Sequence, residues 1–290
     1  MLCGVGDENE FEVDLENGTA FDIDRVSFSY DGRLTSLDKV SLTVNTGERV
    51  AILGSNGSGK STLLKMMDGL YFPASGVVKA FGTLLTEQTF QDESFNFSFR
   101  RRVGLVFQDS DVQLFSPSVW DEVAFAPLQL GLSREEIIAR VNAALAALRI
   151  EKLRDRAPHR LSGGEKKRVA LASVLSLGPE VWLMDEPTAG LDPRSQSWLV
   201  DFIIEQGRVG KTIVTATHDL NIVESIADRV YVLNEDHHVV ADGTPVQILS
   251  DRSLLISCNL MHEHRHRHED VGEEHAHPHL HIPLHMHEHA

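Results

Sequence analysis

The sequence contains the stretch Gly54-Ser-Asn-Gly-Ser-Gly-Lys60-Ser61, which fits the phosphate-loop pattern GxxxxGK(S/T) in full. It follows the short apolar run Val50–Leu53, typical of a strand buried on both faces, and precedes a helical stretch over 61–70. The glycines let backbone N–H groups close around a phosphate, and the helix N-terminus adds a favourable dipole. We expect Lys60 to reach the β- and γ-phosphates of a nucleotide and the Ser61 hydroxyl to ligate Mg²⁺. The alternative, a merely flexible Gly/Ser loop, is disfavoured by this strand–loop–helix context.

A second apolar run, Val181-Trp-Leu-Met-Asp185-Glu186, ends in two acids. Asp185 at the C-terminal edge of a strand suits a Mg²⁺ ligand that acts through water. Glu186 suits a base that polarises the attacking water. Such a run is common by itself, and a solvated strand end is the alternative. Beside a phosphate loop, the two acids indicate a nucleoside triphosphatase.

Periodicity around these motifs predicts an α/β fold. Residues 21–30 and 40–44 alternate apolar and polar positions around the turn signal Asp31-Gly32, which predicts an antiparallel hairpin. Further strands are expected at 77–80, 83–86 and 103–107, and residues 118–157 are predicted to be mainly helical. After Leu161, helices and buried strands alternate, which predicts a parallel sheet with crossover helices. The expected order there is helix 163–177, strand 181–184, helix 193–208, strand 212–216, helix 219–227, strand 230–233, strand 239–241 and helix 246–250.

A third motif, Leu161-Ser-Gly-Gly-Glu165, opens one of these helices. Ser162 can cap the helix, and Gly163 and Gly164 expose bare N–H groups to an anion. A decorated helix cap is the alternative for this motif taken alone. The motif gains weight because it precedes the strand 181–186 that ends in two acids. It would be a second anion-binding helix end in the same chain.

With these motifs, residues 21–260 resemble the ATP-binding subunits of ABC transporters. The loop 54–61 is similar to Walker A, the strand 181–186 to Walker B and the segment 161–165 to the family signature. Four further elements resemble the Q-loop (Val106-Phe107-Gln108), the D-loop (Ala189-Gly-Leu-Asp192), the switch-histidine loop (Thr217-His218-Asp219) and the adenine-stacking aromatic residue (Tyr30).

The resemblance implies a P-loop NTPase fold of ABC type, a mostly parallel sheet with an antiparallel β subdomain and a helical subdomain. It also implies a transport-coupled ATPase with Mg²⁺ and ATP, and a head-to-tail dimer in which each signature segment binds the ATP of the partner subunit. Packing alone is the alternative for Tyr30, and a satisfied core histidine for His218. The implied catalytic residues are Lys60, Gln108, Glu186 and His218; those for Mg²⁺ are Ser61, Gln108 and Asp185; those for ATP are Tyr30, Gly54, Ser55, Asn56, Gly57, Ser58, Gly59, Lys60, Ser61 and Thr62; and those toward the partner's ATP are Leu161, Ser162, Gly163, Gly164 and Glu165, with Asp192 in the D-loop.

Residues 108–127 resemble the energy-coupling-factor branch, which includes cobalt and nickel importers. This resemblance implies that Gln113, Leu114 and Phe115 form a face that docks coupling helices of a membrane T component, with a metal-binding S component as an indirect partner. Ordinary core packing is the alternative for Leu114 and Phe115.

Composition restricts the class of protein. The chain of 290 residues has 43 acidic and 27 basic residues, a net charge of −16, which argues against a nucleic-acid partner. Two cysteines fit a reducing cytosol, and no apolar run reaches membrane-spanning length. We therefore expect a peripheral subunit on the cytoplasmic face of the cell membrane. The expected organisation is an acidic extension over 1–20, the ATPase domain over 21–260 with its helical subdomain about 110–162, and a tail over 261–290.

Eleven of the 15 histidines lie in that tail, mostly two residues apart. Imidazole, with an ordinary pKa near ~6.5, is mostly neutral at pH 7 and suits Ni²⁺, Cu²⁺, Zn²⁺ and Co²⁺. We expect a flexible tail that chelates or senses Ni²⁺ or Co²⁺; a solvated tail without a role and a purification tag are the alternatives. The histidines are His262, His264, His266, His268, His275, His277, His279, His281, His285, His287 and His289.

The combined prediction is a subunit that hydrolyses Mg·ATP to drive uptake of nickel or cobalt. Its alternative is a subunit that energises uptake of another small substrate, such as a vitamin, with the tail storing or sensing metal. Two other classes fit less well. A soluble ABC-type ATPase of nucleic acid or ribosomes would carry fused domains or coiled coils, and a metal-storage protein would not need an intact hydrolytic site. The sequence leaves open nickel against cobalt and a homodimer against a heterodimer.

Overall fold

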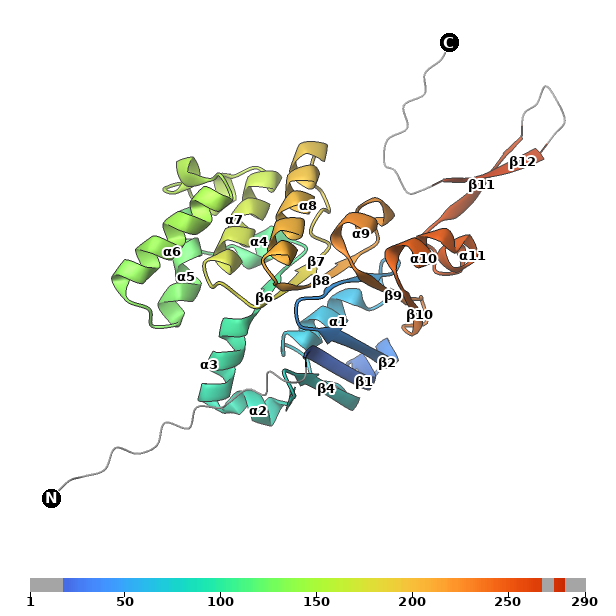
Figure 1. The fold of residues 1–290 in the computed structure, drawn as a ribbon, viewed down its shortest axis with the longest axis horizontal. Helices are drawn as coiled ribbons and strands as arrows, with labels where there is room; N and C mark the ends of the chain where they lie inside the picture. The colour runs from blue at the N-terminus through green and yellow to red at the C-terminus, as the bar shows by residue number, and fades with distance from the viewer. Residues whose placement is uncertain (1–17, 268–273, 280–290) are drawn as a thin grey trace, which may run out of the picture.

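The computed structural model describes residues 18–267 and 274–279, with side chains described over 18–261. A six-stranded sheet forms its centre, in the strand order β10-β9-β3-β8-β7-β6 (Figure 1). Strands β9, β3, β8, β7 and β6 run parallel, and β10 pairs antiparallel with β9. The predicted parallel sheet is thus confirmed. Its strands are β3 (Arg49–Leu53), β6 (Val103–Val106), β7 (Val181–Asp185), β8 (Thr212–Thr217), β9 (Arg229–Leu233) and β10 (Val239–Gly243).

A second, antiparallel sheet of four strands has the order β2-β1-β4-β5. Its first two strands form the predicted hairpin, with Phe21 opposite Val44 and Tyr30 opposite Leu34. Asp31 and Gly32 have φ angles of 51° and 65°, the left-handed conformation that their turn requires. The strands are β1 (Thr19–Tyr30), β2 (Leu34–Asn45), β4 (Ser75–Ala80) and β5 (Thr83–Leu84).

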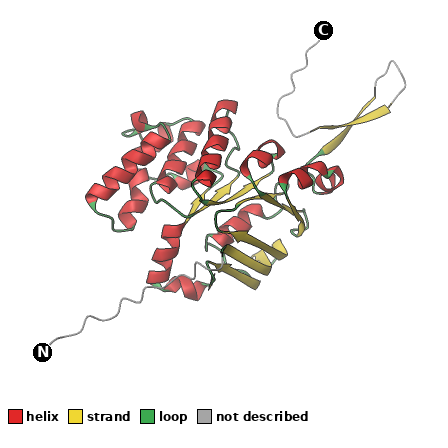
Figure 2. Cartoon of the chain, viewed as in Figure 1, coloured by secondary structure: helices red, strands yellow, loops and turns green. Residues whose placement is uncertain are grey.

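Helices cover the central sheet, as Figure 2 shows. The longest ones follow the predicted alternation, and α5, α6 and α7 pack against one another. They are α1 (Lys60–Met67), α2 (Glu87–Gln91), α3 (Glu93–Arg102), α4 (Ser110–Gln113), α5 (Val119–Gln129), α6 (Arg134–Ala147), α7 (Gly163–Leu175), α8 (Pro193–Arg208), α9 (Leu220–Ile226), α10 (Pro245–Ser250) and α11 (Arg252–Ser257), with 3₁₀ turns η1 (Glu151–Leu153) and η2 (Pro158–Arg160).

Two hydrophobic clusters lie on opposite faces of the central sheet. Ala51 and Leu53 of β3 belong to one cluster, and Val50 and Ile52 to the other. Because successive side chains of a strand face opposite sides, β3 is buried on both faces, as predicted. The first cluster includes side chains of α5 to α9, and the second includes those of α1 and the antiparallel sheet. Helix α1 is therefore held between the two sheets.

Residues 83–102 differ from the prediction. A strand was expected to continue to Thr86, but β5 ends at Leu84 and two unpredicted helices follow. The Thr86 hydroxyl accepts a hydrogen bond from the Thr89 N–H and begins α2, and the Asp92 carboxylate accepts from the Ser94 N–H and begins α3. Aromatic side chains fix both helices by tertiary packing, which the local pattern does not reveal. The packed rings are Phe90, Phe95 and Phe99.

Asp68 directly follows the last residue of helix α1, and only 6% of the residue is exposed. Arg100 of α3 donates to the Asp68 carbonyl at 2.6 Å and to its carboxylate at 3.0 Å. Burial raises the pKa of Asp68 to about 7, although the Arg100 charge opposes this. A carboxylate at a helix C-terminus also faces the negative end of the helix dipole.

We expect Asp68 to lower the stability of the folded state as the pH rises. Its folded pKa lies above its ordinary value near ~4, so the folded state keeps a proton that the unfolded state loses between pH ~4 and ~7. The free energy of unfolding should fall across this window by an amount on the order of 3 kcal/mol. In Asp68→Asn, which stays neutral, this fall should be missing. Urea denaturation at pH 5 and pH 8 measures it, and equal losses in both proteins would contradict the assignment.

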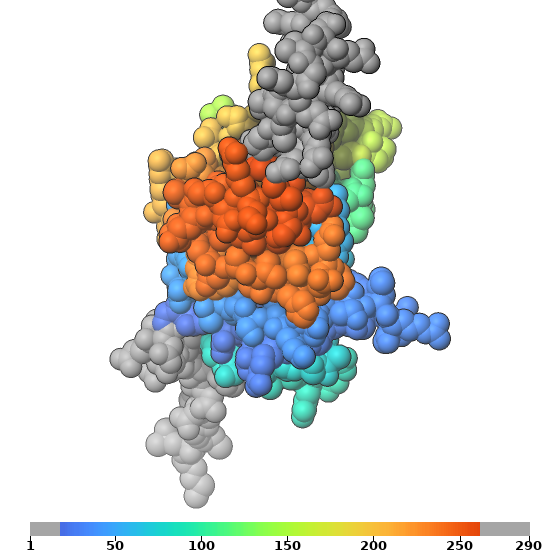
Figure 3. Space-filling view, turned by 90° about the vertical axis from the view of Figure 1, so that its right-hand side faces the viewer, coloured from blue at the N-terminus to red at the C-terminus, as the bar shows by residue number. Residues whose placement is uncertain are grey.

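Beyond α11 the backbone pairs two segments of the tail, β11 (His262–Arg267) and β12 (Glu274–His279), as an antiparallel ribbon. It follows the C-terminal helices, which form the orange-to-red face beside the blue N-terminal strands in Figure 3. The acidic extension over 1–20 falls mostly outside the described residues, as do the histidines at 268, 281, 285, 287 and 289. No helix within the described part of the chain is long and apolar enough to span a membrane.

Candidate functional site

Three parallel strands bring their carboxyl ends to one edge of the central sheet. Leu53 of β3 lies in register with Thr217 of β8, and Asp185 of β7 lies in register with Ala216. The loop 54–59 follows β3, Glu186 follows β7 and His218 follows β8. The topology therefore gathers three of the predicted motifs, although the loop 54–59 lies more than a hundred residues before the other two in sequence.

The loop 54–59 depends on glycine at two positions. Gly59 has a φ of 108°, and a Cβ there would lie 2.2 Å from the Ser36 carbonyl oxygen. A Cβ on Gly54 would lie 2.8 Å from the Leu233 carbonyl oxygen. Both distances are too short for any side chain, so the loop is packed closely against neighbouring backbone and leads directly into the N-terminus of α1.

Lys60 is the cation of this loop, and its residue is only 5% exposed. Its Nζ donates to the carbonyl oxygens of Gly54 at 2.8 Å and Ser55 at 3.0 Å, and lies 3.4 Å from Glu186 Oε1. Burial lowers the pKa of Lys60, while the carboxylates of Glu186 and Asp185 act in the opposite direction. The ammonium group is thus held at the point where the phosphate loop meets the acids of β7.

Ser61 and Asp185 supply adjacent hard oxygen ligands. The Ser61 hydroxyl donates to Asp185 Oδ1 at 2.9 Å, and Asp185 is only 6% exposed. Burial raises the pKa of Asp185, the Ser61 hydrogen bond lowers it, and the neighbouring Glu186 charge raises it further. A hydroxyl and a carboxylate beside a phosphate loop are the donors that Mg²⁺ uses in phosphoryl transfer, so these two residues fit that ion.

Glu186 is buried and paired with His218. The His218 Nδ1 atom lies 2.9 Å from Glu186 Oε1, and the Thr217 hydroxyl donates to Glu186 Oε2 at 3.3 Å. Burial acts to raise the pKa of Glu186, but the His218 hydrogen bond and the Lys60 charge outweigh it, so that pKa lies below its ordinary value. The hydrogen bond to Glu186 raises the pKa of His218. Glu186 is therefore an anion near neutral pH, with one oxygen beside a cation and a histidine.

The backbone of Glu186 is strained. Its φ of 41° lies in the left-handed region, which costs a non-glycine residue on the order of 1 kcal/mol or more. The Glu186 N–H nevertheless donates to the Ala216 carbonyl at 2.9 Å, so the sheet holds the residue in this conformation. The strain sits where β7 turns into the loop that carries the carboxylate.

Tyr30 and Thr62 meet at the side of α1. The Tyr30 hydroxyl lies 3.0 Å from Thr62 Oγ1, which also lies 2.8 Å from Ser36 Oγ. The Tyr30 ring packs edge-on against Phe28 and Tyr71. Tyr71 is a second aromatic residue of this cluster that sequence analysis did not identify.

The segment after β6 is held by a lysine that none of the sequence motifs includes. Lys167 of α7 is 3% exposed, and its Nζ donates to the carbonyl oxygens of Phe107 and Gln108 at 3.0 Å each. Burial lowers the pKa of Lys167 to about 8. Because β6 and β7 are parallel neighbours, this bond fixes Gln108 close to the edge where Asp185 lies.

The three residues of the expected docking face, Gln113–Phe115, differ in their surroundings. The Gln113 side chain accepts from the Phe107 N–H at 3.2 Å and donates to the Ala170 carbonyl at 3.0 Å, so it braces the domain from within. Leu114 packs against the hydrophobic core, as the core alternative predicted. Phe115 is 67% exposed and lies edge-on to the exposed Phe125. Of the three, only Phe115 presents an apolar surface outward.

The signature segment begins α7 as predicted. The Ser162 hydroxyl accepts from the Glu165 N–H, and Glu165 Oε2 accepts from the Ser162 N–H at 2.8 Å, a complete capping box. Asp192 caps the neighbouring α8 by accepting from the Ser195 N–H at 3.1 Å and the Ser195 hydroxyl at 2.7 Å. A pocket of about 360 Å³ lies between them, lined by Ser162, Gly163, Gly164, Glu165, Arg168, Gly190, Asp192 and Ser195.

None of these lining residues belongs to the loop 54–61, β7 or the histidine loop after β8. The structure therefore gathers the predicted site residues into two groups within one chain. One group is the phosphate loop with Asp185, Glu186 and His218, and the other is the signature segment with Asp192.

The turn after β9 contacts the phosphate loop, and no sequence motif predicts this contact. The His237 Nδ1 atom lies 3.2 Å from the Ser58 carbonyl oxygen, and His238 Nδ1 lies 2.8 Å from the Asp38 carbonyl oxygen. His237 has a φ of 67°, which is uncommon for a non-glycine residue. The turn thus supports the phosphate loop from 179 residues away in the chain.

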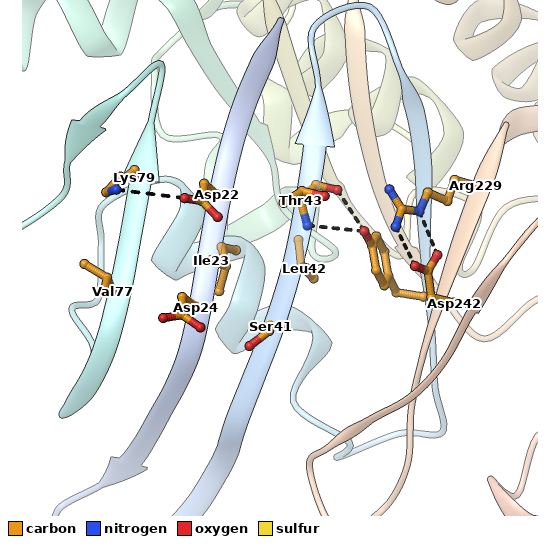
Figure 4. A pocket seen from close by; sticks show the side chains of 11 residues that line it. Asp22, Ile23, Asp24, Ser41, Leu42, Thr43, Val77, Lys79, Arg229 and Asp242 are labelled. Carbon is orange, nitrogen blue, oxygen red and sulfur yellow. Dashed lines mark hydrogen bonds and ion pairs between the residues drawn. The ribbon is translucent and has the colours of Figure 1, made fainter. Parts of the chain in front are cut away.

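A second hollow, of about 450 Å³, lies where β1, β2 and β4 face β9 and β10 (Figure 4). Its charged side chains pair with each other: Lys79 Nζ lies 4.0 Å from Asp22, and Arg229 Nε donates to Asp242 at 2.6 Å. None of the predicted site residues lines it. Among the side chains that the structure describes, no group of three or more His, Cys, Asp or Glu residues is placed to hold a metal ion.

Comparison with known proteins decides the family. Residues 37–189 match the ABC transporter family. The chain belongs to it. This ABC transporter subunit is 51% identical to the nickel import ATP-binding protein NikO of Rhodobacter capsulatus over 245 residues, which are 83% of the chain and 96% of that protein. It is an ATP-hydrolysing, transport-coupled subunit.

Solved structures of ABC subunits agree with the fold. The subunit cbiO1 of Clostridium perfringens, described as part of the ABC transporter complex cbiONQ, is similar with a TM-score of 0.71 and 36% identity, covering 84% of this chain and 95% of that one. A dimeric ATP-binding cassette, MJ0796, bound to ADP and Pi is similar with a TM-score of 0.70 and 28% identity, covering 78% and 98%. The predicted α/β fold of ABC type, with its two sheets, is confirmed.

Proposed function

We propose that this subunit hydrolyses Mg·ATP in a dimer to drive uptake of Ni²⁺ or Co²⁺ through an energy-coupling-factor type transporter. The observation that carries the ATPase part is the convergence of Lys60, Ser61, Asp185, Glu186 and His218 at one sheet edge. The support for the metal is the similarity to a nickel import protein and the resemblance of residues 108–127 to that branch.

Each residue of the first group has a part in hydrolysis. Lys60 and the loop N–H groups hold the β- and γ-phosphates, and Thr62 and Tyr30 lie on the side where the adenosine would extend. Mg²⁺ bound to Ser61 and Asp185, with Gln108 nearby, would neutralise charge on the phosphate oxygens. Glu186 accepts a proton from the water that attacks the γ-phosphorus in line, and ADP is the leaving group. His218 fixes the Glu186 carboxylate through its 2.9 Å contact.

The second group completes the site of another subunit. The pocket at Ser162–Glu165 presents a capped helix N-terminus with two glycines, a surface suited to an anionic γ-phosphate. Since the phosphate loop of the same chain lies on other elements, the anion that this pocket binds belongs to the partner subunit's nucleotide. A head-to-tail homodimer gives two identical composite sites, and the dimeric cassette with ADP and Pi supports this arrangement.

Membrane contact would come from the surface around Phe115 and Phe125. Their exposed rings lie edge-on, 4.9 Å between centroids, and fit the apolar side of a coupling helix of a membrane T component. The metal-binding S component would be reached only through that partner. The subunit would lie on the cytoplasmic face of the cell membrane. The alternative, energising uptake of a vitamin with the tail as a metal store or sensor, predicts the same ATPase site.

Reconstitution distinguishes the two substrates. The full chain is purified with its membrane partners from native membrane and placed in vesicles, and ATP-dependent uptake of radioactive Ni²⁺ and Co²⁺ is measured. We expect metal uptake that the Glu186→Gln variant abolishes. ATP-dependent uptake of a vitamin without uptake of either metal would support the alternative and contradict the proposed substrate.

A further inference from the structure

The histidines of the tail occupy matching positions in the ribbon β11–β12. The backbone register places His262 opposite His279, His264 opposite His277 and His266 opposite His275. We call each such cross-strand pair of histidines a rung. Successive rungs are two residues apart on each strand. The spacing of two in the sequence thus becomes three cross-strand pairs in the structure.

These six positions share one face of the ribbon. Alternate residues of a strand lie on the same face, and residues directly opposite each other in an antiparallel pair also share a face. The other face carries no histidine position within the two strands. Its positions are Glu263, Arg265, Arg267, Glu274, Ala276 and Pro278.

The dimensions of such a ribbon suit a shared metal ion. Opposite Cβ atoms in an antiparallel pair are ~5 Å apart, and alternate residues along a strand are ~7 Å apart. Imidazole nitrogens bind a metal at ~2 Å, so two histidines across a rung, and four in two neighbouring rungs, are close enough to share one ion. Four imidazoles suit a divalent transition metal, whereas Mg²⁺ and Ca²⁺ prefer oxygen ligands.

We propose that the ribbon β11–β12 is a transition-metal site in which two neighbouring histidine rungs bind one divalent ion such as Ni²⁺. The central rung, His264 with His277, belongs to every set of two neighbouring rungs. An ion bound across both strands also stabilises their pairing, because a two-stranded ribbon alone is marginally stable in water. The site does not depend on which substrate the transporter moves.

The test separates this site from simple chelation by a histidine-rich chain. Exchanging two neighbours, His264→Arg with Arg265→His, keeps composition and charge but moves one histidine position to the other face of the ribbon. A matched exchange, His285→Met with Met286→His, changes a position outside the two strands. Calorimetric titration of the full chain with NiCl₂ at pH 7.5 measures affinity, and MgCl₂ serves as the competing hard cation.

We expect the exchange at 264 and 265 to weaken Ni²⁺ binding at least ~10-fold, because even an outer-shell loss costs that much. The exchange at 285 and 286 should leave the strongest site unchanged, and MgCl₂ should not displace Ni²⁺. Equal weakening by both exchanges, equal affinity of all three proteins, or no Ni²⁺ binding would each overturn the proposal. ATP turnover without Ni²⁺ should be the same in all three, so a failure here leaves the ATPase assignment standing.

Discussion

Glu186→Gln is expected to lower ATP turnover by roughly 10²–10⁴-fold, the usual contribution of a general base. Glutamine has almost the same shape and still reaches Lys60 and His218, but its amide does not accept the proton of the attacking water. ATP binding should therefore remain, and dimers with bound ATP should accumulate. Steady-state ATPase assays and size-exclusion chromatography with ATP measure the two effects.

The matched control is Glu180→Gln, an exposed acid just before β7 at the opposite end of that strand. It pairs with Arg102 at the surface and lies away from the phosphate loop. We expect near wild-type turnover in this control. Sustained turnover in Glu186→Gln would refute its role as the base.

Lys60→Ala should weaken ATP binding by roughly 30- to 1,000-fold, as expected when one partner of a buried charge pair is truncated. The substitution removes the cation that we propose to bind the phosphates. It also leaves Glu186 without its 3.4 Å ion pair and two loop carbonyls without a donor. Equilibrium binding of a fluorescent ATP analogue measures the loss.

Lys79→Ala is the control for this variant, because Lys79 is a half-exposed lysine on β4 that pairs loosely with Asp22. Its ATP affinity should match that of the wild-type protein. If Lys60→Ala binds ATP with unchanged affinity, the assignment of the loop 54–61 as the phosphate site is wrong.

Much of the fold follows from local sequence patterns. Strands buried on both faces, such as Val50–Leu53 and Val181–Met184, read as continuous apolar runs, and glycine-rich motifs locate the turns that need unusual backbone angles. Helices α2 and α3 escaped prediction because packed aromatic rings and the Arg100–Asp68 pair stabilise them, and such contacts have no local signature.

The same limit applies to the site. The motifs identify the side chains that we propose to face the nucleotide, but not those that hold the motifs in place. Lys167 contacts a segment 60 residues earlier, and His237 contacts the phosphate loop 179 residues away. The resemblance places the polar side chain of Gln113 on an outward face. In the structure that side chain instead forms hydrogen bonds with the backbone of Phe107 and Ala170. Such long-range contacts arise only from the folded chain.

The shared site between two subunits is tested most directly by mixing two inactive variants. Lys60→Ala removes the cation proposed to bind the phosphates, and in the proposed dimer Gly163→Asp would place a carboxylate against the partner's triphosphate. A Cβ at Gly163 meets nothing within 4 Å, and an acid at a helix N-terminus is favourable, so that variant should fold normally.

A mixed dimer of the two variants carries one intact composite site, with the phosphate loop of one chain and the signature of the other. ATPase activity of the equimolar mixture should therefore recover to roughly a quarter of the wild-type value, since random pairing gives half mixed dimers with one of two sites intact. If mixing restores no activity, or if Gly163→Asp alone turns over ATP at the wild-type rate, the two halves of the site do not come from different subunits.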